Sequence, residues 1–524
     1  MKIPMKGTPA ERQKFFKPVA RRFVNRITFR DALEFNGIHG ISVYRASPGR
    51  QLQYGILRHF LFFAGLFALL LAAHLAHSGV LWTEEDLPLA SALQMSHGSV
   101  LYRDVWFDKP PLVPAVYLLW GARIGPILRL AGAVYALLAC LLAYLLATTL
   151  WTRREGLWAA GLLGFFLTFD THSAMLPLAA DMLLLAPHLA AILLAARKQA
   201  FWSGVAAGVG FLFNAKAVLV LAACLLFAWP GAVALLAGFA IPNLISLAWL
   251  AAHGSFGPWF DQVWRWPALY AASPVVADPI WNGILRTVNW LGFHAALAVG
   301  AAIFWWRTRN WKILAWALLG YAGVVLGWRF FPRYYLLLLP PLTIAAARGF
   351  TSVRARTAAV LAVLLLIVPF VRFGPRYVTL ANDLLHGRRS EWSDVALDED
   401  SRDASRIVLA NARPDATLYV WGYRPEIYVY TRLRPSTRFL ESQAMTGVPA
   451  DRHLTQSGAV ITSGTHEARQ ELAQSQPDIL VDGLSLYNPA LSMTNYTELR
   501  PWLADYREIA RSKGTIIYLR RGGG

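Results

Sequence analysis

The side chains best suited to chemistry lie in the segment 79–128, between two long apolar stretches. Its first part carries three consecutive acids, Glu84, Glu85 and Asp86, and its second part carries Asp108 and Lys109 before two prolines. Acids at a membrane surface can take a proton from an acceptor or hold a cation, and a lysine beside them can hold a lipid phosphate. The pattern indicates a site at a membrane surface, provided that the rest of the chain is a membrane protein.

The composition is that of a polytopic α-helical membrane protein. Of the 524 residues, 56% are hydrophobic and only 15% are charged, whereas a soluble protein carries roughly 25% charged residues. Several apolar runs approach the roughly 20 residues that cross a bilayer. The net charge of +19 fits basic loops kept on the cytoplasmic side better than nucleic-acid binding, because the basic residues lie beside apolar runs. Cys140 and Cys224 both fall inside apolar runs and indicate no disulfide.

The basic residues also predict a topology. A basic tail, 1–55, should lie in the cytoplasm, and a membrane domain, 56–373, should contain about eleven spans. The first outer loop, 79–126, should carry two helices that lie on the membrane surface, at 87–97 and 110–125. The expected spans are 56–78, 127–150, 157–171, 178–196, a hairpin over 202–229, 231–252, 288–306, 313–328, 335–347 and 357–373.

The remaining chain, 374–524, changes character and should lie outside the cytoplasm. Strand-like and helix-like runs alternate in it and predict a small α/β domain with its own core. The strand-like runs are 417–421, 479–481 and 515–519, and the helix-like runs are 467–473 and 498–506. The sequence of this domain has no metal cluster, glycine-rich phosphate loop or nucleophile motif, so the simplest interpretation is a docking or acceptor-guiding module.

Several short motifs follow one another in a characteristic order along the chain. The acid pair in the first outer loop is followed by a helix and then by an aromatic-acid-Lys-Pro stretch. Lys216 follows the fifth span, Phe-Pro-Arg-Tyr-Tyr at 331–335 precedes Leu-Pro-Pro at 339–341, and 420–428 read Val-Trp-Gly-Tyr-Arg-Pro-Glu-Ile-Tyr. This order resembles the GT-C membrane glycosyltransferases. More narrowly, it resembles the group of the dolichyl-phosphate-mannose protein mannosyltransferases and the bacterial lipid A aminoarabinose transferases.

The resemblance implies an inverting glycosyltransferase of the cell inner or plasma membrane, with a polyprenyl-phosphate sugar donor used on the outer face. The sugar would be mannose or a similar hexose or pentose, and the acceptor would be a lipid, a glycan or a protein. The catalytic base would belong to the acid pair Glu84 and Glu85. This chain has Glu where the group usually has Asp first, so Asp86 stays a third candidate.

Such a transfer needs a carboxylate on one side and cations on the other. The carboxylate deprotonates the acceptor hydroxyl, and the leaving phosphate ester needs positive charge rather than a proton. Candidate ligands of the donor phosphate and lipid are Lys109, Lys216, Arg333 and Tyr334. Structural roles compete with this one, because a lysine can snorkel to the surface and Arg or Tyr can anchor a membrane interface.

Asp108 and Asp181 are candidate ligands of a divalent cation, which would be a cofactor of the protein. Hard cations are coordinated by several oxygen ligands, and two carboxylates supply only part of such a set. The alternatives are a local ion pair for Asp108 and a helix-start acid for Asp181. His294 is a third candidate ligand, but a histidine held in the core is the simpler interpretation. The competing function is a transporter or flippase of a lipid-linked substrate. Transporters show repeated halves and ionisable groups at mid-membrane, whereas these acids gather at one face.

Overall fold

The computed structural model describes residues 48–272, 278–388 and 392–522. The chain divides into two units, 1–61 and 62–524. Most of the predicted cytoplasmic tail, 1–55, lies outside the described residues, and its last part begins helix α1 (Pro48–Leu75). The candidate site lies wholly in the second unit.

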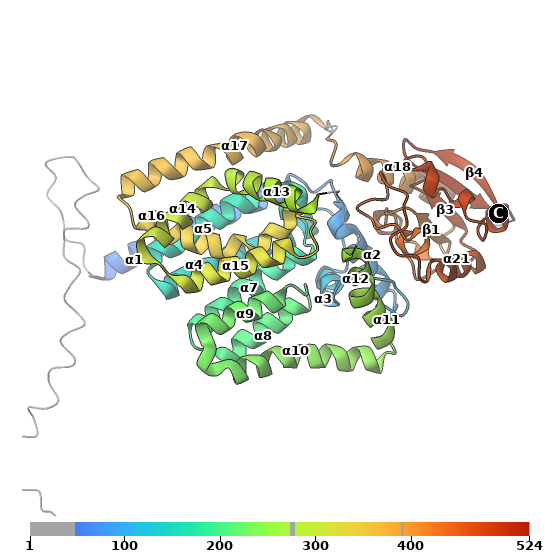
Figure 1. Cartoon of the computed structure of the whole chain (residues 1–524). Helices are drawn as coiled ribbons and strands as arrows, with labels where there is room; N and C mark the ends of the chain where they lie inside the picture. Colours follow the sequence, from blue (N-terminus) through green and yellow to red (C-terminus); the bar gives the residue numbers. More distant parts are fainter. Residues whose placement is uncertain (1–47, 273–277, 389–391, 523–524) are drawn as a thin grey trace, which may run out of the picture. The chain divides into compact units, whose positions relative to one another are not determined.

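Most of the second unit is helical, and its helices follow the apolar runs of the sequence (Figure 1). After the first loop they are α4 (Pro126–Leu150), α5 (Arg153–Thr168), α6 (His172–Met175), α7 (Ala180–Ala196), α8 (Ala200–Phe211), α9 (Ala217–Ala228), α10 (Ala232–Ala252), α11 (Phe256–Phe260), α12 (Trp266–Ala271), α13 (Pro279–Phe293), α14 (Ala295–Thr308), α15 (Trp311–Val325), α16 (Leu339–Thr351) and α17 (Ala355–His386). Side-chain caps fix some of their starts: the Thr152 hydroxyl accepts from Arg154 N before α5, and the Asn310 carbonyl accepts from Ile313 N before α15.

Four helices in the described part are long and apolar enough to cross a membrane, and a bent pair makes up to five. The four are Leu57–Leu75, Pro126–Leu150, Ala217–Ala252 and Ala355–Asp383. Such helices mark an integral membrane protein. Three further apolar helices, α7, α8 and α15, are shorter, so the count of eleven spans and their orientation stay predictions.

The predicted continuous span over 288–306 is wrong. Helices α13 and α14 meet at His294 with a bend of 88°. The His294 ring is fully buried, contacts the Trp290 carbonyl at 3.0 Å, and lies 3.0 Å from Asp170. The helix therefore breaks where a polar side chain is held in the interior, a break that apolar composition does not reveal.

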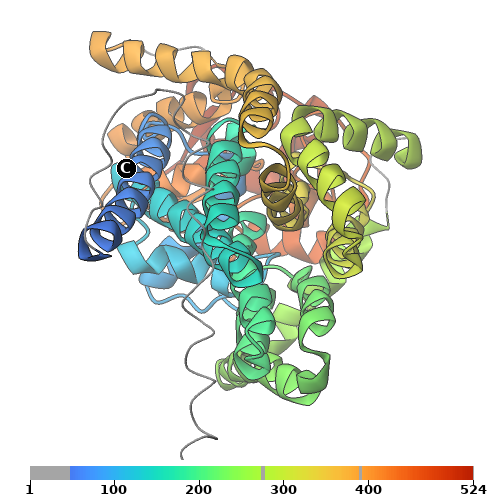
Figure 2. The same cartoon turned by 90° about the vertical axis from the view of Figure 1, so that its left-hand side faces the viewer.

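Close helix contacts in the bundle depend on small residues. A Cβ on Gly204 would lie 1.9 Å from the Leu235 carbonyl oxygen, and a Cβ on Gly238 would lie 2.0 Å from that of Phe201. Only glycine allows α8 and α10 to approach so closely. Small residues at helix contacts are common in membrane proteins, where close packing rather than the hydrophobic effect holds the helices together. Helices α8 to α10 form a group of their own (green in Figures 1 and 2).

The first loop contains the two short helical regions that the sequence predicts. Helix α2 (Thr83–Ser96) covers the predicted 87–97 and begins earlier, so the three acids lie in its first turn. The predicted helix at 110–125 is two short pieces, α3 (Leu112–Ala115) and the 3-10 turn η1 (Val116–Trp120). It ends at Gly121, whose φ of 68° suits glycine.

The C-terminal part is a five-stranded sheet with helices. The strand order is β2-β1-β3-β5-β4, with β1 parallel to β2 and β3, and β5 antiparallel to β3 and β4. The strands are β1 (Thr417–Trp421), β2 (Arg434–Pro435), β3 (Ile479–Asp482), β4 (Tyr506–Arg511) and β5 (Ile516–Arg520). The helices include α18 (Ala396–Asn411), α19 (Glu426–Thr431), α20 (Gln443–Thr446), α21 (Thr465–Gln474) and α22 (Arg500–Leu503).

All three predicted strands and the predicted helix at 467–473 are confirmed. The predicted helix at 498–506 is wrong over most of its length, because α22 is one turn long and Tyr506 already begins β4. Pairing with β5 supplies backbone hydrogen bonds that outweigh the local helix preference. The sheet domain and the first loop share one hydrophobic cluster, which includes Leu89, Phe107, Leu418 and Ile427. Packing therefore fixes the loop against the sheet domain.

Candidate active site

The first turn of α2 aims its three acids at three different partners. Successive helix residues point about 100° apart. Glu84 pairs with Arg333, Glu85 pairs with Arg129, and Asp86 faces the sheet domain. The two members of the predicted catalytic pair therefore lie in different environments.

Glu84 belongs to a group of polar side chains that we call the charge cluster: Glu84, Asp181, Lys216, Arg333 and Tyr334. Arg333 Nη1 lies 2.5 Å from Glu84 Oε1, and Arg333 Nε lies 3.8 Å from Asp181 Oδ2. Lys216 Nζ lies 3.6 Å from Asp181 Oδ1 and 3.2 Å from the centre of the Tyr334 ring. The four ionisable side chains are 12% to 30% exposed. The cluster is thus partly shielded yet within reach of a ligand.

The cluster is assembled from helix ends that are far apart in the sequence. Asp181 lies in the first turn of α7, Lys216 directly precedes α9, and Arg333 and Tyr334 lie in the 3-10 turn η4 (Pro332–Leu337). Asn214 ties two of these ends together, because its amide donates to Asp181 Oδ1 at 2.9 Å and its carbonyl accepts from Lys216 N at 3.0 Å. Polar side chains at helix ends can meet without interrupting the apolar helices.

The Lys216 ammonium has N–H groups that donate no hydrogen bond within the described residues. Its 3.6 Å separation from Asp181 exceeds an ordinary hydrogen-bond length of about 3.2 Å. Within the described residues its Nζ has no hydrogen-bond acceptor. A buried ammonium that lacks acceptors is costly to leave so, which makes Lys216 a strong place for an anion to bind.

Glu85 forms a fully buried ion pair with Arg129 of α4. The Arg129 guanidinium donates to both carboxylate oxygens, to Oε2 at 3.1 Å and to Oε1, and it donates as well to the Val80 carbonyl at 2.6 Å. Glu85 is 0% exposed and Arg129 is 1% exposed. Burial raises the pKa of Glu85, and Arg129 opposes that rise. The pair fixes α2 to α4, and it does not bring Glu85 into the charge cluster.

Asp86 meets a second carboxyl, Glu426 of α19, across the boundary with the sheet domain. The two side chains are 5% and 3% exposed and interact electrostatically. Two buried carboxylates repel each other, which favours the protonated form of one of them. Burial raises the pKa of Asp86 well above its usual value, and Glu426 and Asp398 add to the rise. Burial also raises the pKa of Glu426, but Arg424, itself buried and 3.2 Å from Glu426, opposes that rise, so Asp86 is the acid favoured in its protonated form.

Because the pKa of Asp86 is raised in the folded state, the protein should become less stable as pH rises. The folded pKa of Asp86 lies above its unfolded value of about 3.9. The folded state therefore holds an extra proton, whose contribution is complete below that unfolded value and is lost as pH rises through the folded value. Asp86→Asn should remove this loss, so that its melting temperature falls less steeply as pH rises above about 4 and is higher than that of the unaltered protein by roughly 2–4 °C at alkaline pH. Melting curves of the purified protein in detergent test this, and parallel curves for the two proteins would contradict it.

Asp108 and Lys109 lie near a further acid of the sheet domain. They pair with each other at 2.7 Å, with Lys109 47% exposed. Glu441 is 1% exposed, and within the described chain its Oε1 has no hydrogen-bond partner. Burial raises the pKa of Glu441 to about 8, and Asp108 adds to the rise. After burial, the charges of Asp108, Glu441 and Glu84 raise the pKa of Tyr423, so Tyr423 lies among these carboxylates.

The predicted metal ligands Asp108 and Asp181 lie in ion pairs, and their role in binding a divalent cation stays a prediction. The described residues contain no group of three or more His, Cys, Asp or Glu side chains that suits a metal. Asp181 already faces two cations, Lys216 and Arg333, and Asp108 faces Lys109. Such neighbours repel a divalent cation.

His294 lies in the core at the bend between α13 and α14. Its ring stacks on Trp290 with the ring centres 3.9 Å apart and on Phe166 at 4.5 Å. Its Nε2 lies 3.0 Å from Asp170 Oδ2. These contacts account for the residue as a core histidine, in agreement with the simpler interpretation of the sequence.

Sequence reasoning missed the contribution of the sheet domain. The motif at 420–428 supplies Tyr423, Arg424 and Glu426, whose role at this boundary its sequence does not predict. Nothing in the sequence marks Glu441 as more than an ordinary charged residue. The partner of Arg129 is an acid 44 residues away in the chain. The signal that could have found Arg129 is its position as an arginine inside an apolar span.

Known proteins share the fold of this chain but little of its sequence. The sequence matches no protein-family model and no curated protein. Among solved structures, ArnT from Cupriavidus metallidurans bound to undecaprenyl phosphate matches with a TM-score of 0.56 and 15% identity, covering 88% of this chain and 98% of that one. The apo state of ArnT gives the same values. The oligosaccharyltransferase AglB from Archaeoglobus fulgidus, in complex with an inhibitory peptide and a dolichol-phosphate, has a TM-score of 0.44 and 12% identity, covering 88% of this chain and 74% of that one.

The match to ArnT covers so much of both chains that it must include the membrane helices and the sheet domain together. At 15% identity it concerns the arrangement of the backbone. The chain therefore shares the fold of ArnT, a member of one of the two groups that the motifs resemble.

Proposed function

We propose that the protein is an inverting glycosyltransferase that moves a sugar from a polyprenyl-phosphate donor to an acceptor hydroxyl at the outer membrane face. The observation that carries the proposal is the charge cluster, in which Glu84 lies against Arg333, with Lys216 held close by. A carboxylate beside cations is the arrangement that such a transfer requires. The GT-C fold supports the same conclusion by analogy.

The donor phosphate would bind Lys216 and Arg333. A carboxylate and a phosphate accept the same charge-assisted hydrogen bonds from a guanidinium. Glu84 and Asp181 therefore occupy positions on Arg333 that phosphate oxygens would take. Tyr334 holds the Lys216 ammonium over its ring face. Binding of the donor would release Glu84 from Arg333 and leave its carboxylate free to act as a base.

Glu84 would then take the proton of the acceptor hydroxyl. The acceptor oxygen forms a bond to C1 of the sugar, and the bond from C1 to the phosphate oxygen breaks. The phosphate leaves with the bonding electron pair, stabilised by Lys216 and Arg333. Attack opposite the leaving group inverts the anomeric configuration, and one carboxylate suffices because the phosphate needs no proton. Glu85 would serve as a positioning residue through Arg129.

Lys109 and Asp108 have a supporting part in this proposal. Their ion pair lies at the edge of the site, near Tyr423 and Glu441. The half-exposed Lys109 ammonium would attract an anionic donor headgroup toward the charge cluster. Asp108, its ion-pair partner at 2.7 Å, would hold Lys109 in place.

Lys216→Met should raise the KM for the donor by about 10- to 100-fold, because it removes charge-assisted hydrogen bonds to the phosphate. The KM for the acceptor should stay near its normal value. Lys198→Met is the matched control, since Lys198 donates to the Phe227 carbonyl at 2.9 Å away from the cluster. Steady-state kinetics at varied donor concentration make the comparison, and an unchanged donor KM in Lys216→Met would remove Lys216 from the phosphate site.

The function itself is tested by offering the purified protein in vesicles a panel of labelled polyprenyl-phosphate sugars. Mannose, aminoarabinose and other pentoses should be included, with lipid, glycan and protein fractions as acceptors. We expect one donor to pass its sugar to one acceptor class. Movement of a donor across the bilayer without sugar transfer would support the transporter alternative instead.

We further propose that the N-terminus is cytoplasmic and that the sheet domain, within 374–524, lies outside the inner or plasma membrane. The basic residues beside the apolar runs support this orientation. A tag after Gly524 should be cleaved by protease added to the outer face of intact cells or spheroplasts. Protection of the tag there, with cleavage only after lysis, would reverse the topology.

A further inference from the structure

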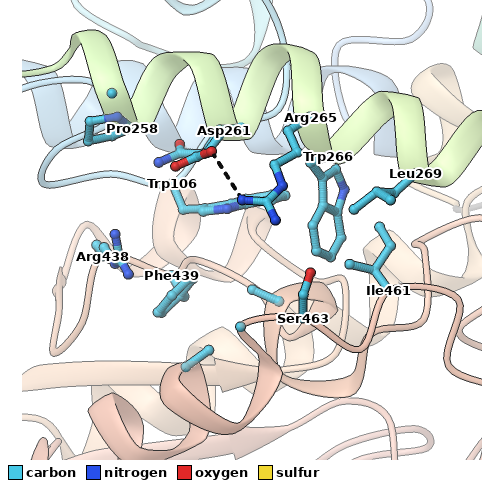
Figure 3. A pocket seen from close by; sticks show the side chains of 15 residues that line it. Trp106, Pro258, Asp261, Arg265, Trp266, Leu269, Arg438, Phe439, Ile461 and Ser463 are labelled. Carbon is cyan, nitrogen blue, oxygen red and sulfur yellow. Dashed lines mark ion pairs between the residues drawn. The ribbon is translucent and has the colours of Figure 1, made fainter.

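A cavity of about 550 Å³ lies between the segment 257–269 and the sheet domain (Figure 3). Small-molecule sites have volumes of roughly 300–1,000 Å³, so the cavity is large enough for a specific ligand. One wall is formed by Trp106 and Trp266, and the opposite wall includes Phe439 and Ile461. It is separate from the charge cluster, since the two share no residue.

The aromatic wall has the geometry of a platform. The rings of Trp106 and Trp266 lie 5.3 Å apart at 84° and so present a corner of one face and one edge. Trp106 is only 6% exposed and is therefore held rigidly. An aromatic face is electron-rich and attracts the slightly positive C–H groups that line one side of a sugar ring. A rigid aromatic surface costs little entropy when it binds.

Charged groups surround this platform. Asp261 and Arg265 form an ion pair with N and O atoms 3.8 Å apart, and they are 62% and 65% exposed. Arg438 contributes a second guanidinium on the sheet-domain side. Guanidinium and carboxylate groups can each make two hydrogen bonds to neighbouring groups of a ligand, which suits adjacent hydroxyls. A lipid chain suits the cavity less well, because it would displace water from these charged groups and offer them no hydrogen bonds in return.

The cavity connects structurally with the proposed active site. Trp106 N donates to the Arg438 carbonyl at 2.8 Å, which joins the first loop to the sheet domain. Two residues after Trp106 the first loop carries Asp108, and three residues after Arg438 the sheet domain carries Glu441. Gln262 locks this junction, because its amide accepts from Phe107 N at 2.9 Å. A ligand in the cavity would therefore be held beside the first loop, close to the transfer site.

We propose that this cavity binds a saccharide portion of the acceptor, stacked on Trp266, which the buried Trp106 supports, and hydrogen-bonded by Asp261, Arg265 and Arg438. The inference rests on the proposed function and adds the chemical class of the acceptor to it. The acceptor is then a glycan or glycolipid whose reacting hydroxyl extends toward Glu84.

Binding is measured first without catalysis. Free di- and trisaccharides built from hexose, N-acetylhexosamine and pentose units are offered to the full chain in nanodiscs, and binding is followed by saturation-transfer NMR. At least one saccharide should bind, and Trp266→Ala should weaken that binding about 10-fold. Trp281→Ala is the matched control, because Trp281 is 62% exposed and lies outside the cavity. It should bind like the unaltered protein.

Kinetics then separate this inference from the proposed function. Trp266→Ala should raise the KM for the acceptor about 10-fold while leaving the KM for the donor, and the slow cleavage of the donor by water, unchanged. If no saccharide binds, or if Trp266→Ala binds equally well, the cavity is not an acceptor site, even where donor cleavage persists. If saccharides bind in a Trp266-dependent way but no donor is ever cleaved, the proposed function fails while the saccharide site stands.

Discussion

Glu84→Gln should lower kcat for sugar transfer by about 10²- to 10⁴-fold, because it removes the group that takes the acceptor proton. Glutamine keeps the shape of the side chain and can still accept a hydrogen bond from Arg333. The variant should therefore insert, melt near the normal temperature and bind the donor with little change. Single-turnover transfer from a labelled donor in proteoliposomes measures the effect.

Glu85 supplies the comparison for this prediction. It neighbours Glu84 in the chain but is fully buried against Arg129. Glu85→Gln should lower both the stability of the protein and, through the position of α2, its activity, whereas Glu84→Gln should lose activity without losing stability. Normal turnover in folded Glu84→Gln would rule out Glu84 as the base and return Asp86 to consideration.

The second large effect concerns stability. Glu85→Leu should destabilise the protein by about 3–5 kcal/mol, because it leaves the Arg129 charge buried without its partner. Arg129→Met should do the same to Glu85. The double variant Glu85→Leu with Arg129→Met should recover most of the loss, since an apolar pair of similar volume often replaces a buried ion pair without cost.

Denaturation of the purified protein in detergent measures all three variants. The double-variant cycle isolates the coupling between the two side chains. Additive losses would show that the ion pair does not link α2 to α4. Since α2 carries Glu84, we also expect the single variants to lower activity through the position of the helix.

Much of the architecture could be predicted from the sequence, because apolar periodicity and basic residues carry local information. The helices α4, α7, α10 and α15 fall on predicted spans, and β1 has the predicted bounds. The break at His294 could not be predicted in this way, because it depends on a buried contact with Asp170 in the connection between α5 and α6. The strand β4 depends likewise on its partner β5.

In the candidate site, too, the sequence predicts some features and not others. Residue type and order brought Lys216 and Arg333 into consideration, and the structure places both with Glu84 and Asp181. Three adjacent acids look equivalent in sequence, since the direction of each side chain depends on helix phase and on distant partners. Arg333 lies 249 residues from Glu84 along the chain. No local pattern distinguishes the acid that meets a cation at the surface from the acid that forms a buried ion pair.

The sheet domain is best regarded as part of the site. Its core is continuous with that of the first loop. Its Glu426 holds Asp86, and its Tyr423 lies among the carboxylates that include Glu84 and Asp108. A module that only docked a partner would not need buried acids at this boundary. Positions on the sheet domain should therefore influence the acceptor more than the donor.

A structure determined with a polyprenyl phosphate bound would test the central claim most directly. The headgroup should lie within hydrogen-bonding distance of Lys216 Nζ and the Arg333 guanidinium, with the Glu84 carboxylate released from Arg333 and facing open space beside the phosphate. A phosphate bound elsewhere, with Glu84 still paired to Arg333, would contradict the assignment of both the donor site and the base.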